Sequence, residues 1–271
     1  MIHLHDELKK CLVAGSEFDQ LMNMDGETFR EMPSEGRRTL RFSCNGLSYF
    51  IKIHRGVGWK EIFKNLFSFR LPIISAKNEW QAITKLNELA IPTTPLIAFG
   101  ERGINPARRE SFVLTRDLGE TISLEELCAE WKETPPDVRF KRALIKEVSR
   151  IARLLHNSGM NHRDFYLCHF LLDQHQGSDP SKPLLYLIDL HRVAKRSSVP
   201  RRWLIKDIGG LYFSALDIGL TRYDIYYFLT EYYQKPLRKI LEDEKDILEE
   251  FTTRAIQNYR IMHKTTPTLP L

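Results

Sequence analysis

Residues 162–169 read His-Arg-Asp-Phe-Tyr-Leu-Cys-His, and Asp189 ends a later apolar run at 186–189. Asp164 therefore lies in a loop after a helical pattern, and His169 follows it five residues later. Two aspartates in this order, with a metal-ligand type between them, are typical of phosphoryl-transfer sites. In such sites a carboxylate orients the accepting hydroxyl, while metal ions offset the charge of the phosphates. The sequence thus predicts phosphoryl-transfer chemistry centred on this stretch.

The sequence on the two sides of this stretch differs in character. Before residue 117, short β-rich runs surround one helical pattern at 75–90, and Asn45-Gly46 joins two of the runs as a tight hairpin turn. The β-rich runs are 39–42, 47–53, 94–99 and 111–115. After residue 117 helical patterns dominate, one of them from Asp137 to Leu155 and ended by Gly159. We therefore expect an α+β protein with a β-rich lobe at 1–117 and a helical lobe at 118–271.

The order of these residues resembles the protein-kinase-like fold. Lys52, Glu79, the triplet 162–164 and Asp189 follow one another as in that fold. More closely, four segments resemble the lipopolysaccharide core heptose(I) kinases of Gram-negative bacteria: 49–56, 159–172, 188–192 and 200–203. The resemblance implies a two-lobed α+β fold with ATP bound between the lobes. It also implies transfer of phosphate from ATP to the first inner-core heptose of lipopolysaccharide, at O4.

The resemblance also implies roles for individual residues. Lys52 would hold the α- and β-phosphates of ATP, Asp164 would be the catalytic base or position the hydroxyl, and Asp189 would hold the metal. Independently, strand alternation would bury Lys52, and a buried lysine normally needs a carboxylate partner. The helical pattern at 75–90 offers Glu79 and Glu88, of which Glu79 fits the family pattern.

Two departures from the kinase pattern concern the metal and the phosphates. His169 stands where an asparagine is usual, so Mg²⁺ is the expected metal with Mn²⁺ as an alternative, because imidazole suits borderline metals better. A packed core histidine is the other interpretation of His169. The segment 32–38 replaces a glycine-rich loop but has one glycine, so we expect Arg37 and Arg38 to contact ATP phosphates.

A basic segment follows Asp189 and predicts the acceptor site. The residues expected to bind the lipopolysaccharide inner-core acceptor are Arg192, Arg196, Arg201 and Arg202. Clustered cations favour an anionic acceptor and speed its encounter, although a solvated loop is the alternative interpretation. Asp207, at the start of an apolar helical run, resembles the buried aspartate that braces the catalytic loop in kinase-like folds.

Composition limits the class of protein. Of the 271 residues, 42% are hydrophobic and 28% charged, which excludes wholesale disorder and fibrous repeats. No stretch approaches the roughly 20 apolar residues of a membrane span, and the first residues lack a secretion signal, so we expect a cytoplasmic protein. The segment 59–70 has aromatic residues every four positions with basic flanks, a pattern that fits contact with the cytoplasmic face of the inner membrane. Packing against the β-rich lobe is the alternative.

The four cysteines predict neither a disulfide framework nor a zinc ribbon. Cys11, Cys44, Cys128 and Cys168 are widely spaced without a CxxC pair, so we expect them to be reduced. A zinc cluster of the histidines near 162–191 does not match a standard spacing.

Three rival functions remain at this point. A kinase of the same fold could use another acceptor, such as Kdo, a small molecule or a protein tyrosine. The missing glycine loop and His169 also fit a non-catalytic kinase-like binding module. The net charge of +5 permits nucleic-acid binding, but the sequence carries no motif for it, and we expect no nucleic-acid partner.

Overall fold

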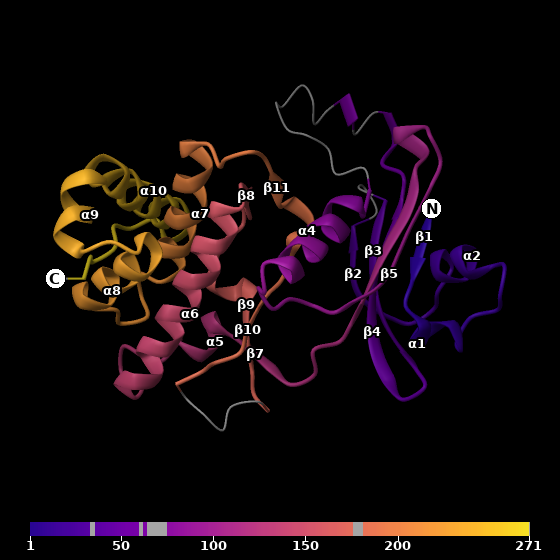
Figure 1. Cartoon of the computed structure of the whole chain (residues 1–271), viewed down its shortest axis with the longest axis horizontal. Helices are drawn as coiled ribbons and strands as arrows, with labels where there is room; N and C mark the ends of the chain where they lie inside the picture. The colour runs from indigo at the N-terminus through magenta and orange to yellow at the C-terminus, as the bar shows by residue number, and fades with distance from the viewer. Residues whose placement is uncertain (33–35, 60–61, 64–74, 176–180, 271) are drawn as a thin grey trace. The chain divides into compact units, whose positions relative to one another are not determined.

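The computed structural model describes residues 1–32, 36–59, 62–63, 75–175 and 181–270 (Figure 1). The chain divides into two compact units. Unit 1 comprises Met1–Lys85, Thr94–Gly119 and Leu190–Arg192, and unit 2 comprises Leu86–Thr93, Glu120–Asp189 and Val193–Leu271. Most of the chain up to Gly119 thus belongs to unit 1, and most of the chain after it belongs to unit 2. The two exceptions are Leu86–Thr93, which packs with unit 2, and Leu190–Arg192, which packs with unit 1.

Unit 1 is built on a six-stranded antiparallel sheet in the order β1-β5-β6-β4-β3-β2. Its strands are β1 (Ile2–Leu4), β2 (Glu27–Met32), β3 (Arg37–Cys44), β4 (Leu47–Arg55), β5 (Leu96–Arg102) and β6 (Glu110–Arg116). Among its described residues are the helices α1 (Asp6–Lys9), α2 (Glu17–Met22) and all but the last turn of α4 (Lys77–Glu88), with the 3₁₀ turns η2 (Pro106–Arg108) and η4 (Leu190–Arg192). The predicted hairpin at Asn45-Gly46 is confirmed, since both residues take positive φ and Cys44 pairs with Leu47.

Strand β4 separates an apolar face from a functional face. Tyr49, Ile51 and Ile53 are buried in a core with residues of α1, α2, β3 and β6. Successive side chains on a strand point to opposite faces, so Lys52 and His54 lie on the other face. The alternation of β4 therefore fixes where the lysine of the predicted site points.

The prediction that all cysteines are reduced is wrong for one pair. Cys11 and Cys44 form a disulfide, with their Cα atoms 6.4 Å apart. The chain after α1 returns to the end of β3, an approach that a separation of 33 residues does not reveal in the sequence. Cys128 and Cys168 are free thiols, and burial raises the pKa of Cys128 to about 12.

Unit 2 is mainly helical. Its helices are α5 (Leu124–Leu127), α6 (Val138–Asn157), α7 (Arg201–Ser214), α8 (Arg222–Tyr233), α9 (Leu237–Asp243) and α10 (Lys245–His263). Two small antiparallel sheets join β7 (Thr121–Ser123), β9 (Phe170–Asp173) and β10 (Leu185–Leu187), and β8 (Met160–Asn161) with β11 (Ala194–Lys195). The 3₁₀ turn η3 (Leu167–His169) lies between β8 and β9. In Figure 1, α7 lies beside α6 and α10.

Helix α6 ends where the predicted site begins. The Asp137 side chain caps its start by accepting hydrogen bonds from the amides of Arg139 and Phe140. Gly159 follows its end with a φ of 77°, and a Cβ there would meet the Arg196 carbonyl oxygen. The Arg196 amide donates to the Gly159 carbonyl at 2.9 Å. This tight approach brings the basic segment after Asp189 beside the start of the loop at 162–169.

Candidate active site

The loop that carries Asp164 is held by the buried carboxylate of Asp207 in α7. Asp207 is fully buried and accepts hydrogen bonds from the amides of His162 at 2.6 Å and Arg163 at 2.8 Å. Arg163 takes a φ of 75°, a conformation that costs energy for a residue with a Cβ. The bonds to Asp207 hold the loop in this conformation, which confirms the predicted bracing role of Asp207.

Asp207 belongs to a larger buried network. The Nε2 of His156 lies 3.3 Å from an Asp207 carboxylate oxygen, and its Nδ1 lies 2.8 Å from the Tyr232 hydroxyl. His162 is fully buried, and its Nε2 donates to the Ile188 carbonyl at 2.9 Å. Burial lowers the pKa of His162, so this ring is neutral with its proton on Nε2. The network links α6, α7, α8 and the strand that precedes Asp189.

His169 and Asp189 lie together in unit 2, beside Asp164. The Nδ1 of His169 lies 2.6 Å from the Asp164 carbonyl oxygen, which can only accept, so Nδ1 carries the proton. In the neutral ring Nε2 then holds a lone pair, and it lies 3.6 Å from an Asp189 carboxylate oxygen. Both side chains are partly exposed. In this neutral form His169 presents an acceptor nitrogen on the side of the Asp189 carboxylate.

The Asp189 carboxylate and the His169 Nε2 are suitable ligands for a divalent metal that also binds phosphates. Mg²⁺ in phosphoryl-transfer enzymes is commonly held by one or two carboxylates, water and the substrate phosphates, which the Asp189 carboxylate matches. The His169 Nε2 adds a nitrogen ligand of the kind that Mn²⁺ accepts more readily than Mg²⁺. Within the described residues, no group of three or more His, Cys, Asp or Glu side chains is arranged as a metal site. The protein ligands present thus suit a metal shared with a nucleotide rather than a closed structural site.

In unit 1, Lys52 forms an ion pair with Glu79 of α4. The Lys52 Nζ lies 2.6 Å from a Glu79 carboxylate oxygen, and the Glu79 side chain is only 6% exposed. A carboxylate this buried requires a cationic or hydrogen-bonding partner. Glu88, the other candidate from the sequence, is exposed at the end of α4. The structure thus selects Glu79 as the partner of Lys52.

His54 is a residue that the sequence analysis missed. It is buried on the same face of β4 as Lys52, and burial, with the charges of Arg37, Lys52 and His191, lowers its pKa to about 3. His54 is therefore neutral at physiological pH. In the sequence, the spacing of two residues between Lys52 and His54 indicates that both side chains lie on the same face of the strand.

Arg37 and Arg38 begin β3. Arg37 pairs with His54 in the strand register, and an Nη atom of Arg38 donates to the Thr28 hydroxyl at 3.2 Å. Residues 33–35 of the turn before them lie outside the described residues. The expected contact of both arginines with ATP phosphates stays a prediction.

The four arginines expected to bind the acceptor occupy different surroundings. Arg192 lies in η4 of unit 1, whereas the other three belong to unit 2. Arg196 donates to the Asn161 side-chain oxygen at 2.7 Å. Arg201 donates two hydrogen bonds to Glu250 of α10, at 3.0 and 2.6 Å, while the neighbouring Arg202 lies over the Trp203 ring.

The aromatic segment at 59–70 is only partly described, since 60–61 and 64–70 lie outside the described residues. Trp59 and Phe63 are each 51% exposed, and their rings stack with centroids 5.8 Å apart. No helix among the described residues is long and apolar enough to cross a membrane.

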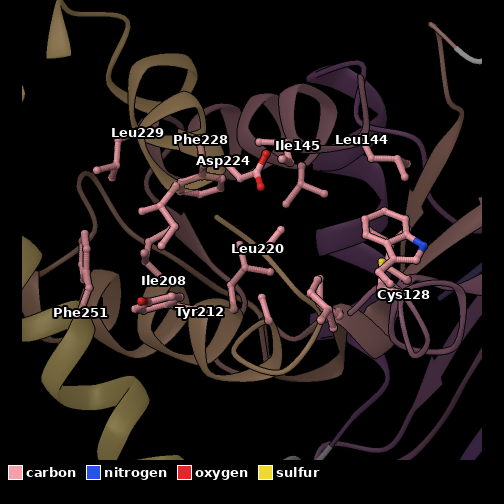
Figure 2. Close-up of a pocket in the computed structure, with 18 of the residues that line it drawn as sticks. Cys128, Leu144, Ile145, Ile208, Tyr212, Leu220, Asp224, Phe228, Leu229 and Phe251 are labelled. Carbon is pink, nitrogen blue, oxygen red and sulfur yellow. The ribbon is translucent and has the colours of Figure 1, made fainter. Parts of the chain in front are cut away.

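Unit 2 also contains an apolar cavity of about 950 Å³, which includes the part open to solvent (Figure 2). Figure 2 shows Leu220 and Ile145 pointing into it between surrounding helices. Its wall comes from α5, α6, α7, α8 and α10 and is almost entirely hydrocarbon. Asp224 is the charged residue in that lining, and it pairs with Lys141 at 2.6 Å. The cavity is therefore suited to an apolar ligand.

The Asp207 network leads to a test of loop positioning. We expect Asp207→Asn to lower the rate of phosphoryl transfer about 10²-fold, because a hydrogen bond to a charged group contributes about 1.5–3 kcal/mol and two are weakened. The amides of His162 and Arg163 should also exchange hydrogen faster. Asp217→Asn is the control, since Asp217 accepts one exposed hydrogen bond from Tyr259. Unchanged exchange at both amides would contradict the bracing role.

Comparisons with known proteins identify the family. The profile of the "Lipopolysaccharide kinase (Kdo/WaaP) family" matches residues 19–232. A protein of Pseudomonas aeruginosa named "Lipopolysaccharide core heptose(I) kinase WaaP" is 45% identical over 94% of this chain and 95% of its own. An Escherichia coli protein of the same name is 46% identical over 94% of this chain and 96% of its own.

A solved structure, described as "WaaP in complex with acyl carrier protein", shares the fold, with a TM-score of 0.83 and 40% identity. The match covers 96% of this chain and 99% of that chain. The predicted α+β kinase-like fold and the predicted resemblance are confirmed. On these matches, which span most of its length, the chain belongs to the lipopolysaccharide kinase (Kdo/WaaP) family.

Proposed function

We propose that this kinase transfers the γ-phosphoryl group of ATP to the first heptose of the lipopolysaccharide inner core, at O4. The observation that carries the proposal is the identity of 45–46%, over 94% of the chain, to two proteins named as core heptose(I) kinases. The position O4 rests on the family resemblance. The Lys52–Glu79 ion pair and the braced loop at Asp164 support phosphoryl transfer.

The proposed roles follow the chemistry of the transferred group. Asp164 positions the heptose hydroxyl and receives its proton. Lys52, held by Glu79, binds phosphate oxygens of ATP, and Arg37 and Arg38 add charge there. The metal, Mg²⁺ with Mn²⁺ as the alternative, would be held by Asp189 and His169 and would neutralise charge on the phosphates. The tautomer of His169 supports this, because its Nε2 lone pair faces Asp189.

The catalytic role of Asp164 gives a direct test. We expect Asp164→Asn to lower the turnover number on the order of 10² to 10⁴-fold, the usual loss when a positioned base is removed. The measurement is transfer from ATP to purified core oligosaccharide, with the new phosphate located by ³¹P NMR. Asp243→Asn, an exposed change at the end of α9, is the matched control. Near-native turnover of Asp164→Asn with an intact fold would refute the assignment.

The same assay separates the rival acceptors. Labelled phosphate on Kdo or on a tyrosine peptide, with none on heptose, would favour a kinase with another acceptor. Absence of ATP turnover with every acceptor would favour a binding module.

We also propose that the chain binds an acyl carrier protein, the partner that its solved relative WaaP holds in complex. The specific observation in favour is the apolar cavity of unit 2, whose hydrocarbon wall matches an acyl chain. Burying acyl methylenes contributes about 0.8 kcal/mol each. In this proposal the carrier delivers its acyl chain to the cavity, so binding depends on acylation.

A cavity-filling variant tests this dependence. Ala215 lies in the cavity wall, and we expect the larger side chain of Ala215→Phe to exclude about two methylene groups of the acyl chain from the cavity. Binding of the acylated carrier should then weaken about 15-fold. Binding of the unacylated carrier should not change. Val13→Phe, at a 69% exposed position of unit 1, is the control, and calorimetric titration is the measurement. Equal affinity of wild type for the acylated and unacylated carriers would contradict the proposal.

We further propose that the protein works at the cytoplasmic face of the inner membrane, with residues 59–70 contacting the lipid surface. The half-exposed, stacked Trp59 and Phe63 support this. We expect Trp59→Ser to reduce cosedimentation with vesicles of anionic phospholipid, and Phe29→Ser, at a 71% exposed aromatic position elsewhere, to leave it unchanged. Equal loss in both variants would count against a specific contact.

A further inference from the structure

Four cations surround a single aromatic ring beside Asp164. Trp203 lies in the first turn of α7, and its ring centroid is 4.7 Å from the Arg163 guanidinium, 5.4 Å from that of Arg202, 5.8 Å from that of Arg196 and 5.7 Å from the Lys206 ammonium. These five residues, here called the Trp203 cluster, all belong to unit 2. They come from the loop at 162–169, the segment after β11 and the start of α7.

The Trp203 ring stabilises the close approach of four cationic side chains. An indole face attracts cations, whereas cations repel one another, so contact with the ring offsets part of the repulsion among the four charges. The Trp203 Nε1 is buried and has no hydrogen-bond partner among the described residues, so contacts with its faces hold the ring.

Two cations of the cluster, Arg196 and Arg202, pair with no carboxylate within the described part of the chain. Arg196 donates to the neutral Asn161 side chain, and Arg202, which is exposed, forms no ion pair within the described part of the chain. Lys206 faces the carboxylate of Asp164, with Nζ and Oδ1 4.0 Å apart. The cluster therefore holds positive charge at Arg196 and Arg202, while its Lys206 lies against the proposed base.

We propose that the Trp203 cluster is the subsite for an anionic sugar of the acceptor, and that Trp203 is a positioning residue that fixes its cations. This inference rests on the proposed function. Arg202 and Arg196 bind the anionic oxygens, and Lys206 sets the distance between them and Asp164. The cluster thus selects a saccharide that carries a carboxylate or phosphate near the accepting hydroxyl.

The geometry assigns this anion to the acceptor rather than to ATP. Lys206 contacts Asp164, the residue that meets the accepting hydroxyl, and Arg163 directly precedes Asp164 in the chain. The groups proposed to hold metal and phosphates, His169 and Asp189, contact each other, and His169 meets Asp164 at its main-chain carbonyl oxygen, whereas Lys206 faces its carboxylate. The neighbouring Arg201 is committed to Glu250 of α10 and is not part of the cluster.

The first arm of the test compares Michaelis constants. We expect Arg202→Gln to raise KM for core oligosaccharide about tenfold and to leave KM for ATP unchanged, as for loss of one hydrogen bond to a charged group. Trp203→Leu should also raise KM for core oligosaccharide. Trp203→Phe should raise it less, because the smaller phenyl ring still attracts cations. Arg222→Gln is the matched control, since Arg222 also lies over an aromatic ring, that of Tyr223 at 5.2 Å, away from the cluster.

The second arm identifies the anion. Wild type and Arg202→Gln are compared on oligosaccharide with its carboxylates methyl-esterified, and on oligosaccharide with its phosphates removed. The penalty of the variant should vanish on whichever substrate lacks the recognised anion, because nothing is left for Arg202 to bind.

Two results would overturn the inference. One is an unchanged KM for the acceptor in Arg202→Gln and Trp203→Leu, and the other is an equal rise in KM for ATP. Failure of the proposed function is distinguishable, because wild type itself would then transfer no phosphate to the oligosaccharide. Arg202→Gln is a surface change, so its result does not depend on refolding of the core.

Discussion

The site depends first on one buried charge. Asp207 has no exposed surface, and a carboxylate without water requires partners inside the protein. Its partners are the amides of His162 and Arg163, with the His156 ring as a third contact. These bonds fix the loop in the conformation that presents Asp164. Loss of the two amide hydrogen bonds would leave the buried carboxylate with the His156 ring as a contact but without two of its donors, so the fold of α7 and the geometry of the loop stabilise each other.

Unit 1 uses the same principle with the charges arranged differently. The alternation of β4 buries Tyr49, Ile51 and Ile53 in the core and directs Lys52 to the opposite face. There Lys52 meets Glu79, whose side chain is nearly fully buried. The carboxylate fixes the direction of the lysine side chain, which a phosphate-binding cation needs. Each unit thus positions one functional side chain by pairing a buried carboxylate.

Features that depend on neighbouring residues could be predicted from residue patterns, whereas the long-range contacts of Lys52 with Glu79 and of Asp207 with the loop were predicted through the family resemblance. The Asn45-Gly46 turn is set by local residue types. The pairing of Cys11 with Cys44 and the contact of His156 with Tyr232 join segments far apart in the chain. No periodicity or spacing encodes such approaches, because the core packing of each unit determines them.

The basic segment shows why charge counts alone are ambiguous. Arg201 and Arg202 are equivalent in sequence, yet consecutive residues on a helix point about 100° apart. One therefore reaches Glu250 and docks α10 against α7, while the other lies over Trp203. The first charge is paired within the fold, and the second belongs to the Trp203 cluster. Helix α7 thereby combines three tasks in its first two turns: it docks α10, gathers cations and, through Asp207, holds the loop that those cations serve.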